Sequence, residues 1–303
     1  MKKSIMSIVC ALLIGLAGLF SGCKADFEIQ DTLANGNGQK VKVVLLAGQS
    51  NASGCSRDEY LQKKVSPDRY AKYQAGYENI YINYFASEKN QSKEFVKVSV
   101  CQGEVGGFFG PELGMAEKLS ALYPNEKFFI IKYAWGGTDL FQKWLSPSSD
   151  GKTGKLYKAF VDYVKTSMKY LRSKNYDAEI VGACWMQGES DSFFVEHGTN
   201  YEVHLTNFIK DMRRAFSKYA EEDIPFIDAY IADNPMYWVY CDLLNESKRK
   251  VNESVPRTAL VDTIAAGLTC NEEPEDNPDM AHYDSLSQLK LGNLFIEELV
   301  KFF

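Results

Sequence analysis

Ser50 follows an apolar stretch near the start of the chain, within the sequence Gly-Gln-Ser-Asn. A serine hydroxyl is a weak nucleophile unless a neighbouring base takes its proton. The chain offers three histidines for that task, His197, His204 and His282. A serine paired with a histidine attacks carbonyl carbons and forms an acyl-enzyme. These residue types therefore predict hydrolysis of a carboxylic ester.

His282 is the preferred base because Asp279 lies three residues before it. A tight turn would bring the carboxylate to the imidazole and fix its tautomer. His204 falls within a helical pattern and suits a surface or packing position, whereas His197 is expected in a loop and stays an alternative base. The sequence leaves more alternatives for the acid than for the base. Asp279 is preferred and Glu189 is the alternative, and a Ser-His dyad without an acid is also compatible.

Ester hydrolysis also needs hydrogen-bond donors for the oxyanion that forms on the carbonyl oxygen. The backbone N–H groups of Ser50 and Gly137 and the side-chain amide of Gln187 would supply three. A glycine suits the second position because the backbone must approach the substrate closely there. Taken alone, the Gly136–Gly137 pair fits a simple turn and Gln187 fits a solvated loop. Their combination with Ser50 and a histidine favours a catalytic site.

The elements that must position these residues alternate between strands and helices. Apolar runs predict buried strands at residues 41–47, 128–134, 180–186, 225–231 and 258–261. Helical spacing predicts helices at residues 111–122, 156–171, 201–216 and 285–302. Such alternation indicates an α/β fold with a central parallel sheet. Ligands bind beyond the carboxyl ends of the strands in these sheets, which is where Ser50, Gly137 and Gln187 fall. Residues 51–100 show no long apolar period and are expected to be less regular.

Five sequence blocks resemble, in the same order, those of the sialic acid O-acetylesterase branch of the SGNH hydrolases. They are LAGQSN at 46–51, GPELG at 110–114, WGG at 135–137, WMQGESD at 185–191 and DMAHYD at 279–284. The resemblance implies a flavodoxin-like, three-layer α/β/α domain over residues 41–303 that needs no metal or other cofactor. It also implies a serine carboxylic-ester hydrolase that removes acetyl groups from sialic acid, xylan or other glycans.

The same resemblance implies individual roles. Ser50 matches the nucleophile, His282 the base, and Asp279 the acid of those members that have one. Gly137 and Gln187 match the second and third oxyanion donors, beside the N–H of Ser50. Positions that match supporting residues are Gln49, Asn51, Gly136 and Glu189.

Two other functions fit parts of the pattern. One is a general α/β-hydrolase lipase or esterase, since Gly48-x-Ser50-x-Ala52 approaches the Gly-x-Ser-x-Gly elbow of that fold. Several strands precede the nucleophile in α/β-hydrolases, however, and their acid lies far from the histidine in sequence. The other is a glycan-binding lipoprotein that has lost catalysis. The presence of every residue that catalysis needs argues against this second alternative.

The first residues have the pattern of a secretory signal: two lysines, an apolar run, and small residues directly before Cys23. The run resembles a bacterial lipobox, with Phe20 where leucine is usual. We expect residues 1–22 to be removed, Cys23 to carry lipid, and residues 23–40 to form a flexible tether. The protein is then an exported lipoprotein of the bacterial cell envelope, bound to the membrane only through this anchor. A plain secretory signal cut near Ala25 is the alternative.

Charge and cysteine usage limit the remaining classes. The chain has 40 acidic and 34 basic residues and a formal net charge of −6. This gives no electrostatic basis for nucleic-acid binding. Five of the seven cysteines lie beyond Cys23, without any Cys-x-x-Cys spacing typical of zinc sites. They allow at most two disulfides, and no pairing is predicted.

Overall fold

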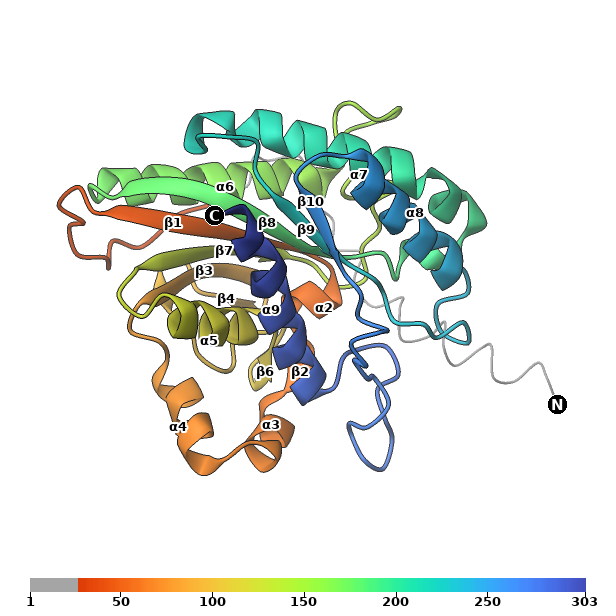
Figure 1. The fold of residues 1–303 in the computed structure, drawn as a ribbon, viewed down its shortest axis with the longest axis horizontal. Helices are drawn as coiled ribbons and strands as arrows, with labels where there is room; N and C mark the ends of the chain where they lie inside the picture. The colour runs from red at the N-terminus through yellow and green to blue at the C-terminus, as the bar shows by residue number, and fades with distance from the viewer. Residues whose placement is uncertain (1–26) are drawn as a thin grey trace.

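The long apolar runs form the middle of a sheet whose two faces are both covered by helices (Figure 1). In this computed structural model, which describes residues 27–303, the central strands are β1 (Lys40–Gly48), β7 (Phe128–Ala134) and β8 (Asp177–Met186). Every residue of β7 is buried. Strands buried on both faces are continuously apolar rather than alternating, which is why the sequence pattern identified them.

The sheet has eight strands, seven of them in the order β10-β9-β8-β1-β7-β3-β4. The outer strands are β3 (Ile80–Ser87), β4 (Asn90–Gln91), β5 (Val96–Lys97), β9 (Phe226–Ala229) and β10 (Thr258–Val261). Neighbours are parallel except β4 and β5, which pair antiparallel with β3. The chain first builds one side of β1 and then crosses to the other. Ligands bind where a sheet reverses in this way.

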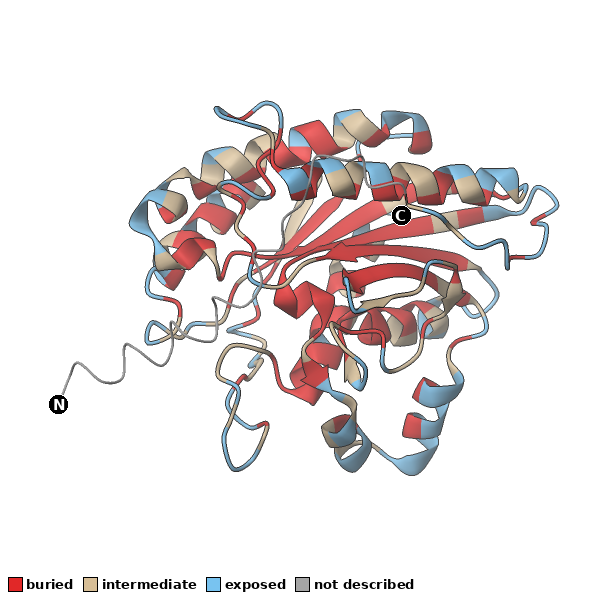
Figure 2. Ribbon diagram, turned by 180° about the vertical axis from the view of Figure 1, so that it is seen from behind, coloured by how far each residue is buried: buried red, intermediate tan, exposed pale blue. Residues whose placement is uncertain are grey.

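Helices form the outer layers. On one face lie α6 (Lys155–Ser173), α7 (Val195–Phe216) and α8 (Cys241–Ser254), and on the other α5 (Glu112–Leu122) and α9 (Ser285–Leu299) (Figure 1). The backbones of α5 and α9 touch at Gly114 and Gly292. A Cβ on Gly114 would lie 2.0 Å from the carbonyl oxygen of Leu289, so only glycine permits this crossing. Buried residues concentrate in the strands and on the inner helix faces (Figure 2).

Short elements fill the segment between β1 and α5. They are α2 (Ser50–Ser53), β2 (Ser56–Arg57), α3 (Asp58–Lys64), α4 (Pro67–Ala75) and β6 (Phe108–Phe109). Strands β2 and β6 pair antiparallel as a separate two-stranded sheet.

All the predicted strands and helices are present, and the three-layer fold is confirmed, but β3 and α8 were not predicted. In β3 the buried Asn83 interrupts the apolar run, and its side chain is satisfied by Ser92, Tyr163 and Ser167. In α8 the buried face includes Ser247 and Lys248, so its apolar period is weak. Both elements bury polar side chains whose partners lie elsewhere in the chain.

The described part of the expected tether packs on the domain instead of hanging free. The Phe27 ring meets Tyr163 edge-on with centroids 4.9 Å apart, and Leu33 is buried. The Asp31 carboxylate lies 2.7 Å from the Lys174 ammonium. Residues 27–39 are therefore better described as the first segment of the domain than as a flexible linker.

The expected signal peptide and the lipidation site at Cys23 lie outside the described residues. Within residues 27–303, no helix is both long and apolar enough to cross a bilayer. The five cysteines of this range, Cys55, Cys101, Cys184, Cys241 and Cys270, are all free thiols.

Candidate active site

Ser50 lies at the carboxyl end of the central strand β1. The strand ends at Gly48, whose φ is +143°, and a Cβ there would lie 1.9 Å from the carbonyl oxygen of Met186. Only glycine fits this close approach, and it lets the chain turn directly into α2 with Ser50 as first residue. The Ser50 side chain is nearly buried, and its hydroxyl makes no hydrogen bond to another residue of 27–303. The oxygen is thus not committed to a structural role.

Asn51 ties this turn to the loop before α9. Its side-chain oxygen accepts a hydrogen bond from the Tyr283 N–H at 3.1 Å. Its backbone carbonyl accepts one from the Gln288 side-chain amide at 2.8 Å. Its amide donates to Glu189 Oε1 at 2.6 Å. One side chain therefore joins the loops after β1 and β8 to the loop that carries His282.

His282 and Asp279 form a close pair in that loop. The distance from His282 Nδ1 to Asp279 Oδ2 is 2.7 Å, and Asp279 Oδ1 accepts a hydrogen bond from the Ala281 N–H at 3.1 Å. Burial opposes the protonated imidazole, but the hydrogen bond to the Asp279 carboxylate offsets it and raises the pKa of His282 above its ordinary value. Burial also opposes the charged form of Asp279, yet hydrogen bonding to His282 lowers the pKa of that carboxyl.

Two residues near His282 were not foreseen as site residues. The Cys55 thiol lies beside the His282 ring and donates to Glu104 Oε2 at 3.0 Å. Burial raises the pKa of Cys55 to about 11, so the thiol stays protonated at neutral pH. The Glu104 carboxylate also lies against Gly136, where a Cβ would be 2.9 Å from Glu104 Oε2. No sequence signal links these residues, because they lie on different loops.

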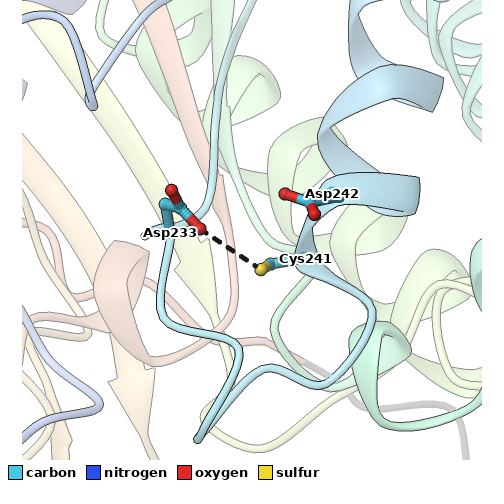
Figure 3. Close-up of side chains that lie close together, drawn as sticks. All are labelled: Asp233, Cys241 and Asp242. Atoms are coloured by element: carbon cyan, nitrogen blue, oxygen red, sulfur yellow. Dashed lines mark hydrogen bonds between the residues drawn. The ribbon is translucent and has the colours of Figure 1, made fainter.

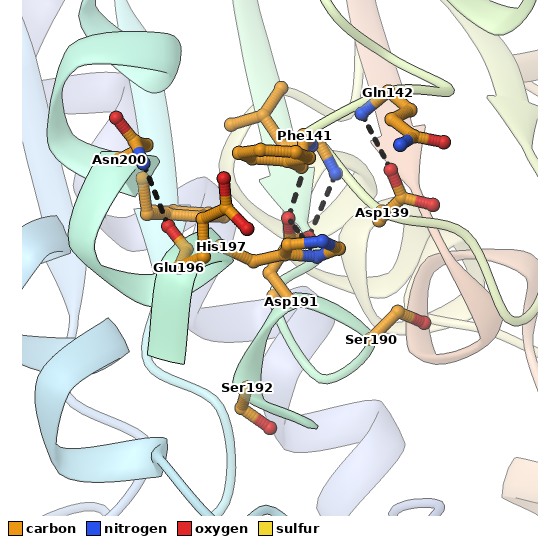
Figure 4. Close-up of polar contacts among 12 residues, drawn as sticks. Asp139, Phe141, Gln142, Ser190, Asp191, Ser192, Glu196, His197 and Asn200 are labelled. Carbon is orange, nitrogen blue, oxygen red and sulfur yellow. Dashed lines mark hydrogen bonds and ion pairs between the residues drawn. The ribbon is translucent and has the colours of Figure 1, made fainter. Parts of the chain in front are cut away.

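The Gly136–Gly137 turn follows β7. Gly137 has a φ of +64°, in the left-handed region, and a Cβ there would meet nothing within 4 Å. Glycine therefore suits this position because of its backbone conformation, and the space beside the turn is open. Asp191, fully buried, accepts hydrogen bonds from the N–H groups of Leu140 at 2.8 Å and Phe141 at 3.1 Å (Figure 4). These bonds anchor the loop that carries Gly137.

Gln187 occupies a different environment from the one expected of an oxyanion donor. It is fully buried, and its side-chain Nε2 donates to Asp191 Oδ2 at 2.6 Å and to the Thr138 carbonyl at 2.9 Å. Its amide has two hydrogens, which are shared among these two acceptors and Gln49 Oε1 at 3.2 Å. The arrangement suits bracing of the loops after β7 and β8 better than contact with a substrate.

The side chain of Gln49 is hydrogen-bonded in a different way from that of Gln187. Its side-chain oxygen accepts from the Gln187 amide at 3.2 Å and from the N–H groups of Ser190 at 3.2 Å and Gly188 at 3.4 Å. The carbonyl end is thereby fixed. The NH₂ end makes no hydrogen bond within residues 27–303, although the side chain is only 2% exposed. This amide belongs to the residue directly before Ser50.

Neither His197 nor Glu189 hydrogen-bonds to His282 within residues 27–303, although Glu189, held through Asn51, is near enough to interact with it electrostatically. His197 belongs to α7 and not to a loop; it stacks on Phe141 with ring centroids 4.1 Å apart, beside Asp191 (Figure 4). Burial lowers the pKa of His197. Glu189 is buried and accepts from Asn51, whereas Asp279 makes the hydrogen bond to His282. The geometry therefore favours Asp279 over Glu189 as the partner of the base.

One group of side chains has the composition of a metal site. Single ligand atoms of Asp233, Cys241 and Asp242 lie within 4.8 Å of one another at the start of α8 (Figure 3). The Cys241 thiol donates to Asp233 at 3.7 Å. Burial and the two carboxylates raise the pKa of Cys241, which disfavours the thiolate that a metal would need.

A hollow of about 420 Å³ lies at the opposite edge of the sheet, beside the amino ends of β1 and β8. Its walls carry both charge signs, including Lys40, Arg172, Asp177 and Glu221. It contains neither Ser50 nor a histidine, so the hydrolytic chemistry does not belong there.

Comparison with known proteins agrees with this geometry. Residues 40–301 match the family described as carbohydrate esterase, sialic acid-specific acetylesterase. No curated protein matches the chain in sequence. The structure of NanS is similar with a TM-score of 0.65 at 16% identity, covering 89% of this chain and 99% of NanS. A protein from Arabidopsis thaliana is similar with a TM-score of 0.61 at 21% identity, covering 86% and 99%.

A carbohydrate acetylesterase from Xanthomonas citri is also similar, with a TM-score of 0.52 at 17% identity over 86% of this chain and 56% of that one. At these identities the structural likeness concerns the fold, whereas the family match covers nearly all of the described residues. The chain belongs to the sialic acid-specific acetylesterase family of carbohydrate esterases.

Proposed function

We propose that the protein is a carbohydrate O-acetylesterase with Ser50 as nucleophile and His282 as base. The observation that carries the proposal is the His282–Asp279 pair, held beside the Ser50 turn through Asn51. Ser50 and His282 are not hydrogen-bonded to each other in the free protein. Such contacts are often long before substrate binds, and the free Ser50 hydroxyl can rotate.

The reaction follows from these roles. His282 takes the proton of Ser50 as the serine oxygen attacks the acetyl carbon, and then gives it to the departing sugar oxygen. The acetyl-enzyme is hydrolysed by water that His282 deprotonates in turn, which releases acetate. Asp279 holds the imidazole and stabilises its protonated form.

The oxyanion is stabilised by the N–H groups of Ser50 and Gly137 and, in this proposal, by the Gln49 amide in place of that of Gln187. Ser50 opens α2, and the first N–H groups of a helix have no acceptor within the helix. The NH₂ of Gln49 has no hydrogen-bond partner among the described residues and its carbonyl is fixed, which is the preorganisation that such a donor needs.

The substrate class is an acetylated glycan. The family is one of carbohydrate esterases, and the similar Xanthomonas citri structure is described as a carbohydrate acetylesterase. The proposal includes export as a cell-envelope lipoprotein anchored through Cys23, with no nucleic-acid partner. The α/β-hydrolase alternative lacks support, because Ser50 follows the first strand of the sheet.

The test is acetate release from 4-nitrophenyl acetate and from an acetylated xylo-oligosaccharide. We expect Ser50→Ala and His282→Ala to lower kcat/KM by at least about 10³-fold, since members of a nucleophile–base unit fail together. His197→Ala is the matched control and keeps the wild-type rate. Equal rates for wild type and Ser50→Ala would mean that the protein binds glycans without cleaving them.

A further inference from the structure

We propose that Glu104 binds a free sugar hydroxyl next to the acetylated oxygen, so that the enzyme selects partially acetylated glycans that carry this hydroxyl. The inference rests on the proposed function and adds to it a residue that no family motif matched here includes. It comes from the position, the partners and the unused hydrogen-bonding capacity of one carboxylate.

Glu104 is fixed at the site by its backbone. Its N–H donates to the Gly54 carbonyl at 2.8 Å, and its own carbonyl accepts from the Ser87 hydroxyl. These two bonds fasten it to the loop after α2 and to the end of β3. The side chain is directed from this anchored backbone to Cys55 and Gly136.

The neighbours of Glu104 place its carboxylate on the sugar side of the reaction. His282 returns its proton to the sugar oxygen, so groups beside the imidazole flank the departing sugar. Cys55 contacts His282 and also donates to Glu104. The same carboxylate lies against Gly136, next to the proposed oxyanion donor Gly137. It therefore lies between the base and the turn that receives the acetyl group.

The carboxylate has acceptor capacity to spare. An ionised carboxylate offers about four lone-pair sites, and within residues 27–303 only the weak thiol donor of Cys55 hydrogen-bonds to it. The Lys132 ammonium interacts electrostatically with Glu104 but is ion-paired with Glu112 at 2.7 Å, and within residues 27–303 no cation forms an ion pair with Glu104 itself. A half-buried carboxylate with unused acceptor sites binds an O–H donor strongly, because hydrogen bonds to charged groups are stronger than those between neutral groups. A free sugar hydroxyl supplies one, and an acetylated neighbour does not.

The experiment uses three substrates with wild type, Glu104→Gln and Glu88→Gln. They are methyl 2-O-acetyl-xyloside, its 3-O-methyl ether, and 4-nitrophenyl acetate, which has no sugar. We expect Glu104→Gln to lower kcat/KM for the xyloside by about 10–100-fold, mainly through KM, and to leave the other two within about 2-fold. Glu88→Gln, which removes an exposed charge next to the end of β3, should match wild type throughout.

Comparison with the ether completes a double-mutant cycle between the substrate hydroxyl and the Glu104 charge. Removing the hydroxyl from the substrate and the charge from the enzyme should cost little more together than either does alone. An equal loss on all three substrates, or additive losses, would overturn the proposal and assign Glu104 an effect through Cys55 and His282. Failure of the proposed function is seen separately, as equal rates of wild type and Ser50→Ala on 4-nitrophenyl acetate.

Discussion

Asp279 Oδ2 lies 2.7 Å from His282 Nδ1 across a turn of three residues. The base must be neutral to accept a proton, so activity falls as the pH drops through the pKa of His282, which is raised above 6.5. Asp279→Asn removes the charge that favours the imidazolium. We expect kcat to fall by about 10²–10⁴-fold and the midpoint of the pH profile of kcat/KM to move to lower pH.

The matched control for this variant is Glu189→Gln, which removes the charge of the other candidate acid. Its midpoint should stay within a few tenths of a pH unit of wild type. A Glu189→Gln variant that shifts the midpoint while Asp279→Asn leaves it in place would reverse the two assignments.

We expect substitution of Gln49 to affect mainly kcat and substitution of Gln187 to affect mainly the free energy of unfolding. Gln49→Glu keeps the acceptor oxygen that Gly188 and Ser190 use but replaces the NH₂. It should lower kcat by about 10²–10³-fold and lower the free energy of unfolding less than the same change at Gln187 does, because no acidic side chain hydrogen-bonds to Gln49 within residues 27–303. Gln187→Glu places a carboxylate against Asp191 and should mainly lower that free energy, measured by urea denaturation. The opposite pattern would return the oxyanion role to Gln187.

Asp191 makes stability depend on pH. Burial raises its pKa to about 7 from an ordinary value of 3.8, so the folded protein binds this proton more tightly than the unfolded chain does. The contribution of the group to stability is therefore greatest at low pH and declines as the pH rises towards 7. Asparagine does not titrate. We expect the destabilisation by Asp191→Asn to be larger at pH 5 than at pH 8, by about 1–3 kcal/mol.

Urea denaturation of both proteins at the two pH values measures this difference. Asp162→Asn, at an exposed carboxyl of α6, is the control for a general charge effect. A deficit that is the same at pH 5 and pH 8 would show that Asp191 does not titrate in this range.

Lys132 and Glu112 form a fully buried ion pair between β7 and α5, with the charged atoms 2.7 Å apart. Lys132 also donates to the Gln102 carbonyl, and Glu112 accepts from the Gly110 N–H. Lys132→Met leaves the carboxylate buried and unpaired, which should cost about 3–5 kcal/mol of unfolding free energy. The double variant Lys132→Met, Glu112→Leu should regain much of that loss. A double variant as unstable as the single one would show that the lost hydrogen bonds, and not the unpaired charge, dominate.

The centre of the fold was predictable because the sequence signal of each buried strand lies within the strand itself. Strands such as β7 are buried on both faces, so their apolar runs are visible in the sequence. The position of Ser50 follows from the end of β1 in the same way. Strand β3 escaped notice because Asn83 is buried and its partners come from other elements.

Other parts of the site depend on contacts that no short segment contains. Cys55 and Glu104 are 49 residues apart and meet because two-residue strands, β2 and β6, pair beside them. The state of the Gln187 amide likewise depends on where Thr138 and Asp191 lie. Sequence identified the residues near the chemistry, but the direction of each hydrogen bond required the assembled loops.

The hydrogen bond between Asn51 and the Tyr283 N–H spans 232 positions of the chain. During synthesis the residue proposed as nucleophile is therefore made early, and the loop carrying its base is made only after every strand of the sheet. A growing chain holds Ser50 without a partner and has no means of attacking esters. Acetate release would then begin only when the two distant parts of the polypeptide have come together. It is therefore a sensitive measure of completed folding.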